Sequence, residues 1–192
     1  MTEQQGRNLG GSNFSNTDPK HKDYWATPQI MVDGLFAYVE LKGIVPKGLH
    51  RLDVCASELN KKCEDFISEE QNTLTTDWGE NNLCWLNPPY SDVQPFLNKA
   101  VREAENGNYT VALLKNDCST KWFHFAAKNA IAVAYIMLGR IGFVSAMTGE
   151  SVGGNNFSSV AFVFGPKKNE GVRSLYVTKS KLEELGKNGE IN

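Results

Sequence analysis

The sequence lacks most of the features that assign a function at first sight. No apolar run approaches the roughly 20 residues that span a bilayer, and no two of the 4 cysteines form a CxxC pair. The 3 histidines have no partner at metal-ligand spacing. Basic and acidic side chains number 20 and 22, which gives a net charge of -2. These absences argue against a membrane protein, a metal site and a basic nucleic-acid coat, so any phosphate contacts must come from local patches.

The composition is that of an ordinary globular protein. The 192 residues are 41% hydrophobic and 22% charged, which suits one domain with a buried core. We expect a flexible tail over residues 1–22, a folded domain over 23–166 and a polar tail over 167–192. The cysteines read as reduced, mostly buried thiols and the first residues carry no signal-peptide pattern, so we expect a cytoplasmic protein.

Hydrophobic periodicity predicts helices and strands in alternation. Helices are expected between Thr27 and Gly43 and over 93–106 and 120–130, with helical turns in 60–66 and 179–185. Strands are expected over 51–56, 83–86, 109–114, 131–138, 141–144 and 159–164. This order predicts an α/β fold, with a mostly parallel sheet and an antiparallel pair at one edge.

The most informative segment is Asn-Pro-Pro-Tyr at residues 87–90, directly after an apolar strand. Neither proline offers a backbone N–H, so the chain must leave the sheet in a rigid, extended conformation. In an open α/β sheet, ligands bind at the carboxyl ends of the strands. The segment therefore presents the Asn87 side chain and the Pro88 carbonyl as acceptors beside the aromatic face of Tyr90.

Two fixed acceptors next to a flat ring suit a planar amino group such as the exocyclic amine of adenine. The lone pair of that amine is delocalised into the ring, so the amine is a poor nucleophile. Accepting hydrogen bonds from both of its N–H groups favours a tetrahedral, more reactive nitrogen, while Tyr90 holds the base by stacking. We therefore predict a catalytic segment made of Asn87, Pro88, Pro89 and Tyr90.

A second strand and turn, at residues 52–57, has the shape of a site for an adenosine-containing ligand. The small side chains of Cys55 and Ala56 let a ligand approach the backbone, and Asp53 at the strand end can meet an ammonium group. The turn lacks the GxGxxG pattern of dinucleotide sites, which argues against a Rossmann-like NAD-dependent enzyme.

Acidic side chains beyond this turn are candidates for the rest of the adenosine site. An acidic residue about 20 positions beyond such a turn often binds ribose hydroxyls, and Glu69 and Glu70 follow it at a similar spacing. Asp77, next to Trp78, can accept a hydrogen bond from the adenine amine of a cofactor.

Several short segments occur in an order typical of one family. They are DYWATP at 23–28, LDVCAS at 52–57, Asn60 with Cys63, Leu74 with Asp77-Trp78, WLNPPYS at 85–91, KWFH at 121–124 and GRIGF at 139–143. Together they resemble the phage-type DNA N-6-adenine-methyltransferase (Dam) family over about residues 23–165. One departure is Lys115-Asn116, where relatives tend to have Pro-Ala, so the resemblance does not predict the shape of that loop.

The resemblance implies a Rossmann-like S-adenosylmethionine-dependent methyltransferase fold and a site-specific transfer of a methyl group to adenine N6 in double-stranded DNA. The product of the donor would be S-adenosylhomocysteine, and the setting would be a bacterial or phage-infected host cytoplasm. The implied cofactor residues are Trp25, Thr27, Pro28, Asp53, Cys55, Ala56 and Asn87, with Trp25, Thr27 and Pro28 framing the methionine end.

Contacts to DNA follow from the need to extrude the target base from the duplex before its amine can react. The enzyme must then hold the neighbouring phosphates, and the candidate side chains are Lys115, Lys121 and Arg140. Asn155 and Asn156, in a glycine-rich polar loop, can pair with an adenine edge. The expected partner is double-stranded DNA, without a membrane or a metal, bound by a monomer or a weak dimer.

Other functions fit the same residues. A rigid segment with two acceptors suits any planar amine, including an RNA adenine or a protein glutamine amide. A non-catalytic module that only binds DNA or the cofactor is a further alternative, although binding alone would not need the geometry of residues 87–90.

Overall fold

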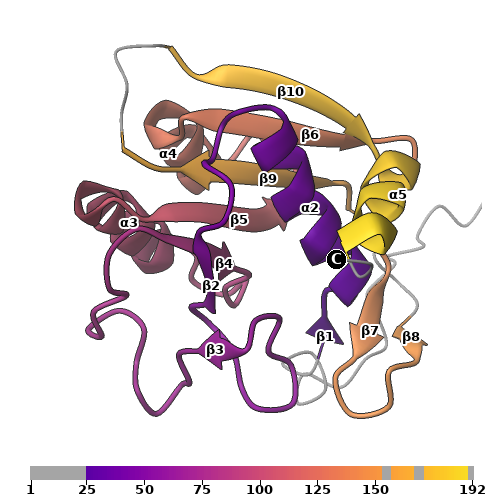
Figure 1. The fold of residues 1–192 in the computed structure, drawn as a ribbon, viewed down its shortest axis with the longest axis horizontal. Helices are drawn as coiled ribbons and strands as arrows, with labels where there is room; N and C mark the ends of the chain where they lie inside the picture. Colours follow the sequence, from indigo (N-terminus) through magenta and orange to yellow (C-terminus); the bar gives the residue numbers. More distant parts are fainter. Residues whose placement is uncertain (1–24, 153–156, 167–170, 190–192) are drawn as a thin grey trace, which may run out of the picture.

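The computed structural model describes residues 25–152, 157–166 and 171–189. Within them, 7 strands form one sheet in the order β10-β6-β9-β5-β4-β2-β3 (Figure 1). The bounds are β2 His50–Asp53, β3 Asp65–Phe66, β4 Asn82–Leu86, β5 Tyr109–Lys115, β6 Ala132–Met137, β9 Ser159–Phe164 and β10 Arg173–Thr178. The predicted α/β architecture with a mostly parallel sheet is confirmed, and it is consistent with a Rossmann-like methyltransferase fold.

The antiparallel strand of this sheet is β9, which runs opposite to both of its neighbours, β5 and β6. The other strand pairs are parallel. We expected the antiparallel pair at an edge, but the structure places β9 inside the sheet. The reason is that all residues of β9 are buried, and such a strand needs cover on both faces. β10, which alternates between exposed and buried residues over much of its length, forms the edge instead.

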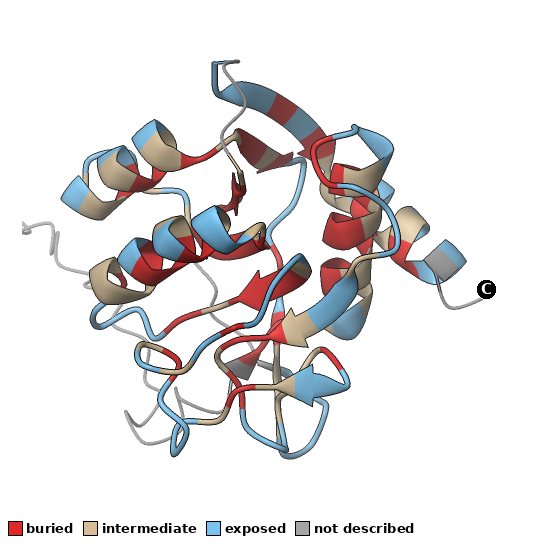
Figure 2. Cartoon of the chain, turned by 60° about the vertical axis from the view of Figure 1, so that its left-hand side comes forward, coloured by how far each residue is buried: buried red, intermediate tan, exposed pale blue. Residues whose placement is uncertain are grey.

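Helices cover both faces of the sheet, which gives three layers. α2 (Gln29–Leu41) and α5 (Lys179–Gly189) pack on one face, where Phe36 meets Trp85 edge to face at 6.0 Å. α3 (Gln94–Glu103) and α4 (Lys121–Asn129) pack on the other, where Phe123 meets Phe162 at 5.1 Å. Figure 2 shows the buried residues of these helices facing the sheet. None of the described helices has the length and apolar character that a membrane span requires.

The helix ends follow the local sequence signals. Gly43 has a φ of 63° just beyond α2, and Gly107 has a φ of 81° after the 3-10 turn η1 (Ala104–Asn106) that extends α3. Glycine adopts this left-handed conformation at no steric cost, so it ends a helix. At the start of α4, Thr120 Oγ1 accepts a hydrogen bond of 3.3 Å from the backbone N–H of Phe123.

The domain extends beyond residue 166, where the sequence suggested a polar tail. β10 pairs in parallel with β6, and α5 packs on α2 with Leu182 fully buried. Leu175 and Val177 supply the buried, apolar side of β10. Their alternation with exposed residues did not predict a strand because most of the surrounding sequence is polar. The helical turn predicted over 179–185 is confirmed as part of α5. The predicted tail over residues 1–22 lies outside the described residues.

Two local predictions differ from the structure. Residues 60–66 form turns and the short strand β3 rather than helical turns, because the Asp53 side chain binds the backbone of this segment, as described below. The segment predicted as a strand over 141–144 leaves the main sheet at Leu138 and Gly139, whose φ angles are 54° and 147°. It becomes β7 (Phe143–Ser145), which pairs with β1 (Trp25–Ala26) and β8 (Ser151–Val152) in a separate sheet near the amino end of α2 (Figure 1).

Candidate active site

The Asn-Pro-Pro-Tyr segment follows β4 and leaves the sheet at its carboxyl end, as predicted. Pro88 is buried and Pro89 is exposed, while 38% of the Tyr90 surface is accessible. Asn87 Oδ1 is buried and has no hydrogen-bond partner among the described residues. Among those residues, no donor binds the Pro88 carbonyl either. Since a buried acceptor without a donor costs free energy, Asn87 Oδ1 is an atom of this segment at which a further hydrogen-bond donor would be favourable.

The Asp53 turn lies directly beside this segment, on the neighbouring strand. Asp53 pairs in register with Trp85, and the Val54 N–H donates to the Trp85 carbonyl at 3.0 Å. The two oxygens of the Asp53 carboxylate accept hydrogen bonds from the backbone N–H groups of Cys55, at 3.2 Å, and Lys62, at 2.9 Å. The carboxylate thus closes the turn, and burial raises its pKa to about 6 in spite of these bonds.

The amino end of α2 is joined to the same turn. Gln29 Nε2 donates to the Lys62 carbonyl at 3.1 Å, and Lys62 N–H is the donor to Asp53. Thr27, just before the helix, is 1% exposed, and its Oγ1 is buried without a partner among the described residues. Pro28 rather than Thr27 is the N-cap residue, so the Thr27 hydroxyl is not used to cap the helix. Trp25 lies in β1, and its side chain is not among those that the structure describes.

The acidic loop after β3 runs along the other side of the Asp53 turn. The Ile67 N–H donates to the Asp53 carbonyl at 2.8 Å, and the Ala56 N–H donates to the Ile67 carbonyl at 3.2 Å. Glu69 and Glu70 are exposed in this loop. Burial raises the pKa of the Cys55 thiol to about 12, with smaller contributions from the charges of Asp53 and Glu69. Cys55 is therefore a neutral thiol.

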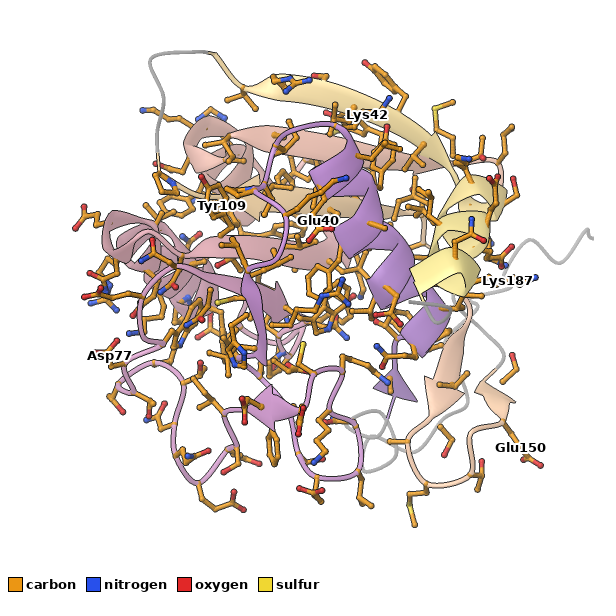
Figure 3. All side chains as sticks on the ribbon, viewed as in Figure 1. Glu40, Lys42, Asp77, Tyr109, Glu150 and Lys187 are labelled. Carbon is orange, nitrogen blue, oxygen red and sulfur yellow. The ribbon has the colours of Figure 1, made fainter. Side chains whose placement is uncertain are left out.

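Asp77 and Trp78, which we expected in the cofactor site, lie at the opposite edge of the sheet. The Trp78 carbonyl accepts a hydrogen bond from Asn82 Nδ2 at the amino end of β4. The Trp78 ring is 2% exposed, and its Nε1 donates to Thr73 Oγ1 at 2.9 Å. Figure 3 shows Asp77 across the molecule from Glu150, which follows β7. Trp78 is a core residue, because its indole is both buried and satisfied.

Lys115 ends β5 next to the Asn-Pro-Pro-Tyr segment. Its Nζ atom lies 4.7 Å from the centroid of the Tyr90 ring and 4.8 Å from that of the Phe157 ring. Phe157 is held nearby because the Asn116 N–H donates to the Ser158 carbonyl at 2.8 Å. Desolvation raises the pKa of the Tyr90 phenol to about 12, so Tyr90 is neutral at physiological pH.

Two of the other residues predicted to contact DNA, Lys121 and Arg140, are described, and both are exposed at this edge of the sheet. Lys121 is the first residue of α4, which follows β5, and Arg140 follows β6. Asn155 and Asn156 lie outside the described residues. No group of three or more His, Cys, Asp or Glu residues among the described ones is arranged to hold a metal ion.

Sequence reasoning missed three residues at this edge: Gln29, Lys62 and Phe157. Gln29 and Lys62 are joined by a hydrogen bond from a side chain to the backbone of a residue 33 positions away. No local sequence pattern reveals such a contact. Phe157 carries a weak signal, since it is a large apolar residue in a polar, glycine-rich loop and stays 50% exposed.

Comparisons with known proteins show the family of this chain. A family model described as DNA N-6-adenine-methyltransferase (Dam) matches residues 14–189. A Haemophilus phage HP1 (strain HP1c1) protein named DNA N-6-adenine-methyltransferase is 40% identical over 174 residues, covering 90% of this chain and 96% of that protein. An Escherichia phage T1 protein of the same name is 37% identical over 176 residues, covering 84% of this chain and 71% of that protein. The chain described here belongs to the DNA N-6-adenine-methyltransferase (Dam) family.

Proposed function

We propose that this chain is a site-specific DNA adenine methyltransferase that transfers a methyl group from S-adenosylmethionine to adenine N6 in double-stranded DNA. The observation that carries the proposal is Asn87 Oδ1 at the carboxyl end of β4, which is buried and has no hydrogen-bond partner in the described part of the chain. Beside it stand the Pro88 carbonyl and the Tyr90 ring, which together match the two N–H groups and the flat face of adenine. The names of the relatives point to the same reaction.

The cofactor is proposed to lie along the Asp53 turn. Thr27 Oγ1, buried without a described partner, is available to a polar group of the methionine end. Cys55 and Ala56 are small enough for the adenosine to approach the backbone, and the exposed Glu69 carboxylate suits ribose hydroxyls as hydrogen-bond donors. Glu70 is a second candidate for the ribose. When bound, S-adenosylmethionine supplies an electrophilic methyl group on a sulfonium.

The Asn-Pro-Pro-Tyr segment is proposed to bind and activate the amine. Asn87 Oδ1 and the Pro88 carbonyl would accept hydrogen bonds from its two N–H groups, which turns the nitrogen lone pair away from the ring, so that it can face the methyl carbon that the donor supplies. Tyr90 fixes the plane of the base by stacking. The prolines hold these groups in place before the substrate arrives, so little reorganisation is needed during the reaction.

The DNA is proposed to bind across the carboxyl edge, with the target base extruded into the site. Lys121 and Arg140, both exposed there, are candidates for the flanking phosphates. Asn155 and Asn156 are candidates for reading bases. A chain with a net charge of -2 depends on such local contacts for DNA binding.

The decisive experiment is to incubate the full chain with labelled S-adenosylmethionine and, in parallel, with genomic DNA, total RNA and cell protein. We expect label in DNA alone, and mapping of N6-methyladenine is expected to give one short recognition sequence. Label in RNA or protein alone would assign a different planar amine. Binding of the donor without incorporation into any of the three would identify a non-catalytic module and overturn the proposal.

A further inference from the structure

The cation of Lys115 lies between two aromatic side chains at the proposed catalytic edge. Its Nζ atom is at nearly equal distances, 4.7 and 4.8 Å, from the ring centroids of Tyr90 and Phe157. Among the described residues, Lys115 belongs to none of the ion pairs. Tyr90 and Phe157 are 38% and 50% exposed as residues, so both side chains of this cluster border on solvent.

The topology brings these three side chains together from adjacent strands. β5 lies between β4 and β9 in the sheet. Lys115 ends β5, Tyr90 follows the end of β4, and Phe157 precedes β9, where Ser159 pairs with Lys115. Tyr90 is held by the preceding prolines and the neighbour of Phe157 by its bond to Asn116. The lysine stem, with its rotatable methylene groups, is the member of the cluster that is free to swing away.

We propose that Lys115 holds the place of the target base in the DNA-free enzyme and that the extruded adenine displaces its ammonium from between Tyr90 and Phe157. The inference rests on the proposed function, because it needs an extruded base. A cation and a base use the same surface of an aromatic ring, the former through the ring quadrupole and the latter by stacking. Lys115 and the base therefore compete for one position.

This role differs from the phosphate contact that the sequence suggested for Lys115. A phosphate contact adds to DNA affinity and to its salt dependence, since each neutralised phosphate releases counterions. A placeholder opposes extrusion and leaves the salt dependence unchanged. The two roles therefore predict opposite effects when the charge of Lys115 is removed.

The test uses a duplex that carries 2-aminopurine at the adenine mapped as the wild-type target, because the fluorescence of this base rises when it leaves the stack. Saturating enzyme is used, so the signal reports extrusion rather than binding. Lys115→Met removes the charge and keeps an unbranched apolar stem. We expect the equilibrium constant for extrusion to rise about 2- to 30-fold, the equivalent of a lost cation–π contact, with the salt slope of DNA binding unchanged.

Three controls accompany this variant. Lys115→Arg keeps a cation over the rings and is expected to match the wild type. Lys128→Met removes an exposed lysine from the last turn of α4 and is expected to change neither readout. Lys115→Gln is a second neutral variant that replaces Lys115→Met if thermal melting shows a folding defect, and the same rise is expected for it.

The outcomes separate the inference from the function on which it rests. Unchanged or weaker fluorescence in the neutral variants, or a salt slope reduced by about one, would overturn the placeholder role and favour a phosphate contact. If the wild type methylates no adenine in DNA, the proposed function itself fails. If it methylates the mapped adenine and the neutral variants extrude the base no better, only the inference about Lys115 fails.

Discussion

Gly34 of α2 and Gly186 of α5 each face the backbone of the opposite helix. A methyl group on Gly34 would overlap the carbonyl oxygen of Leu182, and one on Gly186 would overlap that of Ile30. The two helices therefore approach each other as closely as their backbones allow. Because α2 also begins at the proposed cofactor edge, through Thr27 and Gln29, α5 supports the helix that positions that edge.

Gly34→Ala and Gly186→Ala are expected to lower the free energy of unfolding by about 1–3 kcal/mol each, since backbone must move to admit the methyl group. Alanine would stabilise an isolated helix, so a loss of stability is attributable to packing. Urea denaturation measures the effect. Gly171→Ala, where an added methyl group meets nothing within 4 Å, is the control and is expected to be nearly neutral. Equal stability of all three variants would contradict the close approach.

Asn87→Ala is expected to reduce methyl transfer by about 100- to 1,000-fold, by analogy with the loss of one group of an oxyanion hole. It should leave the melting temperature unchanged or slightly raised, because Asn87 Oδ1 has no described partner in the folded chain. Initial rates and thermal melting are measured on the same preparation. A variant that loses activity only because it unfolds would assign Asn87 a structural role.

Asp53 is expected to make the free energy of unfolding fall as pH rises from about 4 to about 6. Burial raises the pKa of this carboxyl from 3.8 to about 6, so within this window the folded chain holds a proton that the unfolded chain has released. The stability from the neutral form is complete below about pH 4 and is lost as pH rises through about 6.

Urea denaturation of the wild type and of Asp53→Asn, between about pH 4 and about pH 7, tests this dependence. The stability of the wild type relative to the variant is expected to decline by about 3 kcal/mol across the range. The Asn variant serves as its own control because it cannot titrate. Parallel stability curves would show that Asp53 has an ordinary pKa in the folded chain.

Trp78→Phe and Glu69→Gln are expected to separate stability from cofactor binding. Trp78→Phe removes the indole N–H that donates to Thr73, so we expect it to lower the free energy of unfolding by about 1–2 kcal/mol and leave the cofactor affinity unchanged. Glu69→Gln, at an exposed position, is expected to weaken cofactor binding at unchanged stability. Calorimetric titration with S-adenosylmethionine and urea denaturation measure the two quantities. A large loss of affinity in Trp78→Phe would return Trp78 to the cofactor site.

The elements that the sequence predicted correctly depend on short-range signals. The alternation of apolar segments and the positions of Gly43 and Gly107 indicate where helices lie and end, because periodicity and left-handed backbone angles are local properties. Asn-Pro-Pro-Tyr after an apolar strand likewise places the proposed catalytic segment at the carboxyl edge of the sheet, because proline cannot continue the hydrogen-bond ladder.

The sequence by itself therefore determined the α/β class, most helix and strand positions and the proposed catalytic segment. Only the tertiary structure decided that β9 lies inside the sheet, that β10 and α5 complete the domain and that Trp78 belongs to the core at the opposite edge. It alone also placed Lys115 between Tyr90 and Phe157. These features depend on which distant segments pack together. Burial of a strand on both faces, or the position of a lysine between two aromatic rings, is a property of the assembled layers, and no local pattern encodes it.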